Sequence, residues 1–311
     1  MDMHKRIGIL LGGGPPGRVP SLRAGDAVLG ALRGMGHEAT SVFVDREVDL
    51  ALRQERIDVA FIATRGRYGG DGCLQGLLEL LGIPYTGSGV LASSLAMNRE
   101  KTKEVLRLHN LPTAPAYVIR AGREERVADA HGSFGFPVVV RPVRAPSPLG
   151  FVVASDEIEL EAAVEEAFRR DDEVLVERHV EGRRVTVGIL DGLPLGMRGG
   201  APKDTSTRQR SLLRLATAVY EALGCEGAAC VDLLVNDRFN EVVLNVDTQP
   251  SLVPTDSFAR IAQGAGLKFE DIVREILTGA RLRAHGHRDN RRTLQLAFEG
   301  PDRRATAATA H

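Results

Sequence analysis

Three glycines near the amino terminus have the spacing of a phosphate-binding loop. Gly12, Gly14 and Gly17 follow an apolar run and satisfy the pattern G-x-G-x-x-G. Asp45 ends the next apolar run. In dinucleotide-binding folds such glycines let backbone N–H groups approach a pyrophosphate, and the acid binds a ribose hydroxyl. Read literally, the pattern predicts an NAD-dependent enzyme.

Prolines in the same loop argue against that interpretation. Pro15 and Pro16 have no N–H group to donate, and Pro20 delays the helix that would face the phosphates. An ordinary turn between a strand and a helix explains the glycines equally well. The dinucleotide enzyme is therefore kept only as a remote alternative.

The composition excludes several classes of partner. The chain has 311 residues, 43% of them hydrophobic, and a formal net charge of −1, which gives no attraction to nucleic acid or to an anionic membrane. No run approaches the roughly 18–20 apolar residues needed to cross a bilayer. A signal-peptide pattern is absent from the first residues. We expect a cytoplasmic protein, and Cys73, Cys225 and Cys230 are expected to be reduced structural thiols.

Apolar runs and amphipathic stretches divide the chain into three units and a tail. Buried-strand runs alternate with helical patterns in the first unit, which predicts a Rossmann-like parallel sheet with crossover helices. Mixed α+β patterns follow, and the end is basic with little periodicity, with His285 and His287 as weak candidates for metal binding. The predicted boundaries are 1–97 for the Rossmann-like domain, 98–183 and 184–280 for two further lobes, and 281–311 for a mobile tail.

Several segments resemble the D-alanine–D-alanine ligases of the ATP-grasp superfamily. They are LLGG, LQGLLELLGIPYTGSGVLASSLAM, GFPVVVRP, VLVERHVEG and ALGCEG, and the similarity runs from about Arg6 to Leu277. The resemblance implies an ATP-grasp fold, combining α/β and α+β units, and a homodimer formed through the first domain. In that peptidoglycan-related family, ATP phosphorylates the carboxylate of one D-alanine and the amine of a second attacks the acylphosphate, with Mg²⁺ screening the triphosphate.

The resemblance places a nucleotide between two β-rich lobes. Two nucleotide-binding lysines of the family match Arg99 and Arg141, and the segment that frames the adenine matches Glu177 to Val180. A family glutamate near the ribose is Arg184 here. The resemblance therefore implies ATP contacts at Arg99, Arg141, Glu177 and Val180.

The resemblance also implies a magnesium site. The family's metal-binding aspartate matches Asp232, and its E-x-N pair matches Asn245 and Asp247. Carboxylate and amide oxygens are the hard ligands that Mg²⁺ requires. The alternative is that Asn245 and Asp247 merely end a strand at a polar loop, and both interpretations stay open.

Positions at which the family performs its chemistry carry different side chains. Gly17 replaces a glutamate that holds the first substrate's ammonium group, and Arg65 replaces a histidine. Cys230 replaces an arginine that stabilises an oxyanion, and Asp256 replaces a serine that receives the second substrate's carboxylate. Ser147 is retained, between two prolines that stiffen its loop. No residue is assigned as catalytic.

The loop that covers the active site in relatives is also changed. GGAPKDTSTRQR contains no aromatic residue, and a lid that excludes water protects an acylphosphate. We therefore predict a pseudoenzyme: ligation is lost or strongly reduced, and the chain acts as a binding or regulatory protein for a nucleotide or another small molecule. The alternative is an active ATP-dependent carboxylate–amine ligase with an altered substrate, in which Asp256 and Arg65 bind a cationic acceptor or an extra carboxylate.

Overall fold

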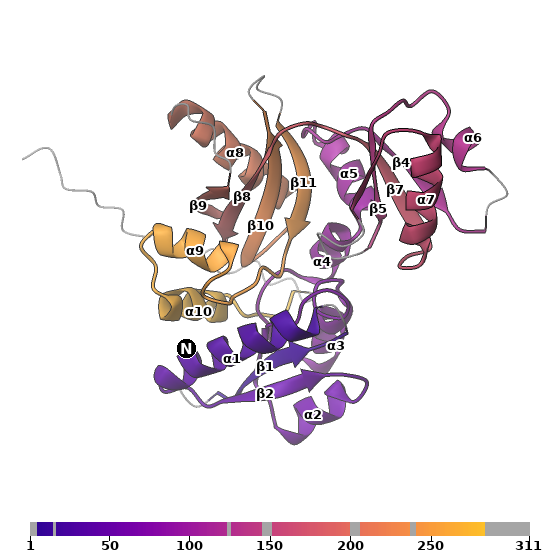
Figure 1. Ribbon diagram of the computed structural model, residues 1–311. Coiled ribbons are helices and arrows are strands. Elements are labelled where there is room, and N and C mark those ends of the chain that lie inside the picture. The colour runs from indigo at the N-terminus through magenta and orange to yellow at the C-terminus, as the bar shows by residue number, and fades with distance from the viewer. Residues whose placement is uncertain are drawn as a thin grey trace, which may run out of the picture.

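The elements of the chain gather around three separate sheets (Figure 1). The computed structural model describes residues 5–14, 17–122, 126–144, 151–199, 206–236 and 241–283. Two of the sheets stand side by side in Figure 1, with the first sheet below them.

The first sheet is parallel, as the alternation of strands and helices predicts. Its region contains β1 (Ile7–Gly12), α1 (Arg18–Gly34), β2 (Ala39–Val44), α2 (Val48–Gln54), β3 (Val59–Ile62), α3 (Cys73–Leu81) and α4 (Val90–Met97), and the next helix, α5 (Arg99–Leu108), packs through Leu106 in the core of the third sheet. The strand order is β2-β1-β3. Side chains of β1 alternate between two cores, because Ile9 and Leu11 share a cluster with α1 whereas Leu10 shares one with α2 and α3. Helices on both faces explain why the whole strand is buried.

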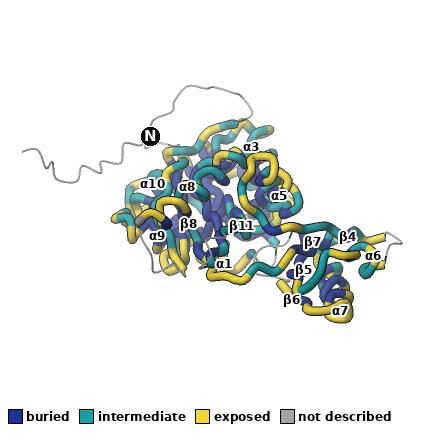
Figure 2. The backbone as a smooth tube through the Cα atoms, turned by 90° about the horizontal axis from the view of Figure 1, so that it is seen from above, coloured by how far each residue is buried: buried dark blue, intermediate teal, exposed yellow. Residues whose placement is uncertain are grey.

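The second sheet is antiparallel and forms the central lobe. The elements of this lobe are β4 (Ala116–Arg120), α6 (Val127–His131), β5 (Val138–Pro142), β6 (Val152–Ala154), α7 (Glu157–Phe168) and β7 (Glu173–Arg178). The strand order is β4-β7-β5-β6. The apolar stripe of α7 packs on one face through Leu160 and Val164. Figure 2 shows this lobe projecting to one side of the molecule, with its buried backbone between the strands and α7.

The third sheet carries helices on both faces. The elements are β8 (Arg183–Leu190), β9 (Leu193–Gly199), α8 (Ser206–Ala222), β10 (Ala228–Val235), β11 (Glu241–Asp247), α9 (Ser257–Gly264) and α10 (Phe269–Thr278). The strand order is β11-β10-β8-β9, with antiparallel pairing throughout. Val231 and Leu233 of β10 face a cluster that contains α8, whereas Ala228 and Cys230 face α9 and α10.

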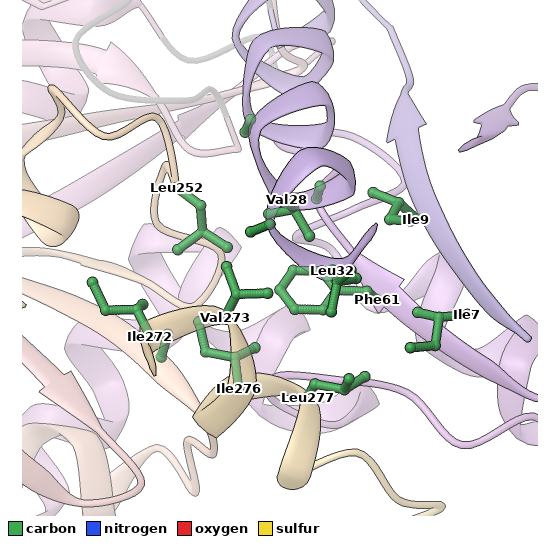
Figure 3. Close-up of a cluster of buried hydrophobic side chains, with 14 of the residues drawn as sticks. Ile7, Ile9, Val28, Leu32, Phe61, Leu252, Ile272, Val273, Ile276 and Leu277 are labelled. Carbon is green, nitrogen blue, oxygen red and sulfur yellow. The ribbon is translucent and has the colours of Figure 1, made fainter. Parts of the chain in front are cut away.

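One core joins the first sheet to the last part of the chain. Val28 and Phe61 lie in the same buried cluster as Leu252, Val273 and Ile276 (Figure 3). Burying apolar side chains from both regions in one cluster holds them together. The loops that follow β1 and β3 are therefore held against the loop that follows β11.

The structure bears on two further predictions, one about membrane-spanning helices and one about the tail. Within the described ranges, no helix combines the length and apolarity that a bilayer-spanning segment needs. The beginning of the predicted tail is anchored, because Arg281 and Arg283 both form ion pairs with Glu226. The rest of the tail, with His285 and His287, lies outside the described residues.

Candidate active site

A buried ion network lies where the central lobe meets β11. Glu177 on β7 binds Arg141 of β5 at 2.6 Å and Lys103 of α5 at 2.8 Å. All three side chains are almost fully buried, with 5–8% of their surface exposed. Burial opposes the charge of Glu177, but the cations of Arg141 and Lys103 lower the pKa of its carboxyl group. The carboxylate therefore stays ionised inside the protein.

Arg99 begins α5 beside this network. Its Nη1 atom donates to the carbonyl oxygens of Pro142 and Val143, both at 3.2 Å. Burial, reinforced by the charge of Arg141, lowers the pKa of Arg99 to about 9. The Nε atoms of Arg99 and Arg141 are buried and have no hydrogen-bond partner among the described residues. Buried unpaired donors are costly, so both guanidinium groups are suited to receive an anionic ligand.

Lys103 is a site residue that the sequence reasoning missed. It lies four residues after Arg99, so both side chains project from the same face of α5. That spacing is a signal the sequence offers. Together with Thr113, Leu244 and Asn245, the cations Arg99, Lys103 and Arg141 line a cleft between the two lobes.

The predicted metal-binding residues lie on one face of the third sheet. Asp232 of β10 pairs in register with Asn245 of β11, and Cys230 pairs with Asp247. Residues two apart on a strand point to the same side, so Asp232 and Asp247 are diagonal neighbours about 7–8 Å apart. The structure therefore brings all three predicted residues together.

Arginine side chains bind both carboxylates of this group. Arg184 contacts Asp232 at 2.6 Å, and Arg65 contacts Asp247 at 2.7 Å. The remaining oxygens are also engaged: Thr186 donates to Asp232 at 2.6 Å, and the backbone N–H of Gln249 donates to Asp247 at 2.9 Å. Each carboxylate oxygen therefore already accepts a hydrogen bond.

This arrangement does not fit a magnesium ion. Mg²⁺ needs near-octahedral oxygen ligands, and a cation about 4 Å from a guanidinium is repelled by on the order of 4 kcal/mol per unit charge. Among the described residues, no group of three or more histidine, cysteine, aspartate or glutamate side chains is placed to hold a metal. A divalent cation at Asp232 or Asp247 would first have to displace an arginine.

Two of the departures from the family pattern are neighbours in space. A Cβ atom built on Gly17 would lie 2.6 Å from the backbone oxygen of Arg65, closer than real contacts allow. A side chain at position 17 therefore does not fit while the Arg65 backbone takes this path. Gly17 makes room for the loop that carries Arg65 to Asp247.

A second cleft lies between the first sheet and the loop after β11. Its walls include Arg65, Thr86, Gln249 and Ser251. The Nε2 atom of Gln249 is buried there without a hydrogen-bond partner among the described residues. The first cleft borders residues 243–246 and the second borders residues 248–252, so β11 and its following loop connect them. Asp247 lies at the junction.

Cys230 is almost fully buried beside this junction. Burial, followed by the charges of Asp247 and Asp232, raises the pKa of its thiol. The thiol is therefore neutral, so Cys230 supplies no positive charge at this position. The guanidinium of Arg65, however, binds the residue directly opposite Cys230 on the neighbouring strand.

The glycine loop uses its backbone donors within the protein. The N–H of Gly12 donates to the hydroxyl of Ser21 at 3.0 Å, and that of Gly13 donates to the carbonyl of Val44 at 3.2 Å. A pyrophosphate would have to compete for both groups. This geometry disfavours the remote dinucleotide alternative, and Asp45 caps the following turn by accepting from the N–H of Glu47.

The remaining candidates are Val180, Asp256, Ser147 and the predicted lid. Val180 is half-buried just after β7, and Asp256 precedes α9 as its N-cap without a side-chain capping bond. Ser147 and residues 200–205, half of the predicted lid segment, lie outside the described residues.

Comparison with known proteins matches most of the chain. The family model described as D-ala D-ala ligase C-terminus matches residues 106–198 and 200–278, and the model described as D-ala D-ala ligase N-terminus matches residues 46–88. A protein of Trichlorobacter lovleyi named D-alanine–D-alanine ligase is 42% identical over 90% of this chain and 96% of its own length. A Geobacter sulfurreducens protein of the same name is also 42% identical over 90% of this chain and 96% of its own length.

Solved structures confirm the predicted ATP-grasp architecture. A Bacillus anthracis D-alanine–D-alanine ligase complexed with ATP superimposes with a TM-score of 0.81 at 27% identity, covering 88% of this chain and 97% of its own. The VanG D-Ala:D-Ser ligase of Enterococcus faecalis superimposes with a TM-score of 0.79. At 21% identity the second likeness shows the fold alone.

These relatives contradict the prediction of a pseudoenzyme. Sequences about 40% identical over 90% of the chain are named as ligases, which favours an active ligase, so the predicted loss of ligation and the prediction of a non-enzyme are both wrong. The prediction counted Cys230 as a lost positive charge, and no local sequence pattern shows that Arg65 reaches the residue opposite Cys230 from another part of the chain.

Proposed function

The chain belongs to the D-alanine–D-alanine ligase family, and on that premise we propose that it is an ATP-dependent carboxylate–amine ligase of this type with an altered substrate. The observation that supports the proposal is the junction of two clefts at β11. One cleft is lined by the cations Arg99, Lys103 and Arg141, and the other contains Arg65 and Ser251. A ligase needs such a junction, because its two substrates must meet.

We propose that the first cleft binds ATP. Phosphate oxygens would accept from the guanidinium groups of Arg99 and Arg141, whose Nε atoms have no partner within the described part of the chain. Glu177 would hold Arg141 in place, and Val180 would lie against the adenine. One solved relative is complexed with ATP, which is consistent with this assignment.

The proposed reaction has two steps. A carboxylate oxygen of the first substrate attacks the γ-phosphorus of ATP, and the bond to the β–γ bridging oxygen breaks to release ADP. The amine of the second substrate then attacks the acyl carbon, loses a proton, and displaces inorganic phosphate as the peptide-type bond forms. Negative charge develops on the acyl oxygen during this second step.

We propose that Arg65 stabilises that oxygen together with the backbone N–H of Ser251. Both residues line the second cleft, and Arg65 replaces the positive charge that position 230 lacks. A preorganised donor of this kind typically lowers a barrier by about 3–4 kcal/mol. The ion pair with Asp247 also fixes the orientation of the Arg65 guanidinium.

The acceptor is expected to differ from D-alanine. Asp256 would repel an acceptor carboxylate placed next to it and attract a cationic group. We therefore propose that a D-amino acid with a cationic side chain is a better acceptor than one with a neutral side chain.

The test is ligation by the purified protein with ATP and a panel of neutral, cationic and acidic D-amino acids. Phosphate release and the mass of the product are measured together. ATP-dependent formation of a dipeptide is expected. ATP binding without any product across the panel would contradict the proposal.

We further propose that the protein is a homodimer formed through its first domain. Two apolar side chains there are largely exposed, Leu80 of α3 at 88% and Leu91 of α4 at 71%. Light scattering should give twice the chain mass, and Leu91→Lys should give the single mass. Leu108→Lys on α5, exposed at 78%, is the control and should leave the dimer intact. A wild-type protein with the mass of one chain would contradict the proposal.

A further inference from the structure

The carboxylates at the junction of the two clefts are balanced by side chains of the protein itself. Asp232 and Asp247 each bind one arginine, at 2.6 Å and 2.7 Å. The charges of the two aspartates and the two arginines cancel. A divalent cation gains little from a site whose negative charge is already balanced.

The arginines have donors left for a second anion. In each pair only the Nη2 atom contacts the carboxylate, and the Nε and Nη1 groups have no further partner among the described residues. Arg184 and Arg65 remain partly open, with 52% and 30% of their side chains exposed. A guanidinium held on one edge by a carboxylate can donate from its other edge to a phosphate oxygen.

The two arginines come from separate parts of the chain. Arg65 follows β3 of the first sheet, and Arg184 belongs to β8 of the third sheet. Gly17 gives the loop of Arg65 the room it needs, as shown by the 2.6 Å approach of a Cβ atom at that position. The arrangement therefore depends on three positions at once.

From this geometry we propose that the guanidinium groups of Arg65 and Arg184 take the place of a divalent cation at Asp232 and Asp247, so that the polyphosphate of the nucleotide binds without Mg²⁺. The nucleotide part rests on the proposed function, whereas the replacement of the metal rests on the ion pairs alone. Positive charge that other ATP-dependent enzymes take from a metal is supplied here by side chains.

The first experiment measures Mn²⁺ binding to the ligand-free protein by electron paramagnetic resonance. The wild type is expected to lack a tight site. The double variant Arg65→Gln and Arg184→Gln frees both carboxylates and is expected to gain one. Tight Mn²⁺ binding by the wild type would overturn the proposal, and so would the failure of a folded double variant to gain a site.

The second experiment measures the Kd of ATP in EDTA and in Mg²⁺ by calorimetry. The wild type should show a difference below about threefold, whereas the double variant should bind at least about tenfold more weakly in EDTA and recover with Mg²⁺. A wild-type Kd that weakens about tenfold or more in EDTA would overturn the proposal. Absence of ATP binding under both conditions would refute the proposed function together with the nucleotide part, while the Mn²⁺ result would still decide the metal replacement.

Matched controls separate these effects from loss of folding. Arg6→Gln with Arg274→Gln removes two ion-paired arginines outside both clefts and should change neither measurement. Arg184→Gln alone removes the more exposed of the two arginines, and it should fold as the wild type does by circular dichroism. It should show about half or less of the double variant's gain in Mn²⁺ affinity on a logarithmic scale.

Discussion

The two arginine–carboxylate groups of the candidate active site differ in how far water reaches them. In the first cleft, Glu177 binds Arg141 and Lys103 with all three side chains almost fully buried. At the junction, Arg65 and Arg184 bind their aspartates with 30% and 52% of the arginine side chains exposed, although Asp232 itself is only 5% exposed. The same chemical pairing therefore occurs in two different dielectric surroundings.

This difference distinguishes ion pairs that hold the fold together from ion pairs that can exchange a partner for a ligand. A buried ion cannot lose its partner without a large desolvation penalty, so breaking the Glu177 network is expected to destabilise the packing of the central lobe on α5. An exposed pair contributes little to stability and can exchange its partner for a ligand. The junction is therefore the place where charge is free to change during a reaction.

The largest expected effect comes from removing the buried carboxylate. Glu177→Leu leaves Arg141 and Lys103 buried without a counter-ion, and it should lower the free energy of unfolding by about 3–5 kcal/mol in urea denaturation. Glu104→Leu, which breaks the exposed pair with Lys101, is the control and should lower the free energy of unfolding much less. Equal losses in the two variants would remove the distinction between the regions.

A second prediction concerns the exposed pair and catalysis. Arg65→Ala should lower kcat of ligation by about a hundred- to a thousandfold, because it removes the donor that we propose for the developing oxyanion. The free energy of unfolding should fall by about 1 kcal/mol or less, since the pair is partly solvated. Arg274→Ala, which removes an exposed pair with Asp271, should leave kcat unchanged. An Arg65→Ala enzyme that is unstable but fully active would reverse the roles assigned to the two regions.

The smallest predicted effect is a pH dependence of stability. The pKa of Glu177 is lowered in the folded protein below its ordinary value of 4.5. Its contribution to stability is therefore fully present above that value and declines as the pH falls through the lowered pKa. In urea unfolding at a series of pH values, the wild type should lose stability on acidification more steeply than Glu177→Gln. If the wild type and Glu177→Gln lost stability equally steeply on acidification, the carboxyl group of Glu177 would not be ionised in the folded protein.

Much of the first cleft could be predicted from the sequence. Arg99, Arg141 and Glu177 lie in segments whose helix or strand character is clear from local pattern, and the resemblance places them around one ligand. Lys103 was within reach of the same reasoning, because it lies one helical turn from Arg99. The parallel first sheet followed from the alternation of apolar runs and helical patterns.

The charge balance at the junction could not be predicted in this way. Arg65 and Asp247 are 182 positions apart, and Arg184 and Asp232 are 48 apart. No local pattern connects such residues. Gly17 illustrates the same limit, because its role is to leave space for the Arg65 backbone and not to bind anything itself.

The sequence by itself determined the elements, the family and the identity of the charged residues, because helical and strand periodicity and short motifs are properties of neighbouring positions. Tertiary structure alone decided which charges neutralise one another, because Coulomb attraction and desolvation depend on distance in space and on burial. Next to Cys230, which looked like a lost arginine, the guanidinium of Arg65 arrives from the loop that follows β3 and binds the opposing Asp247.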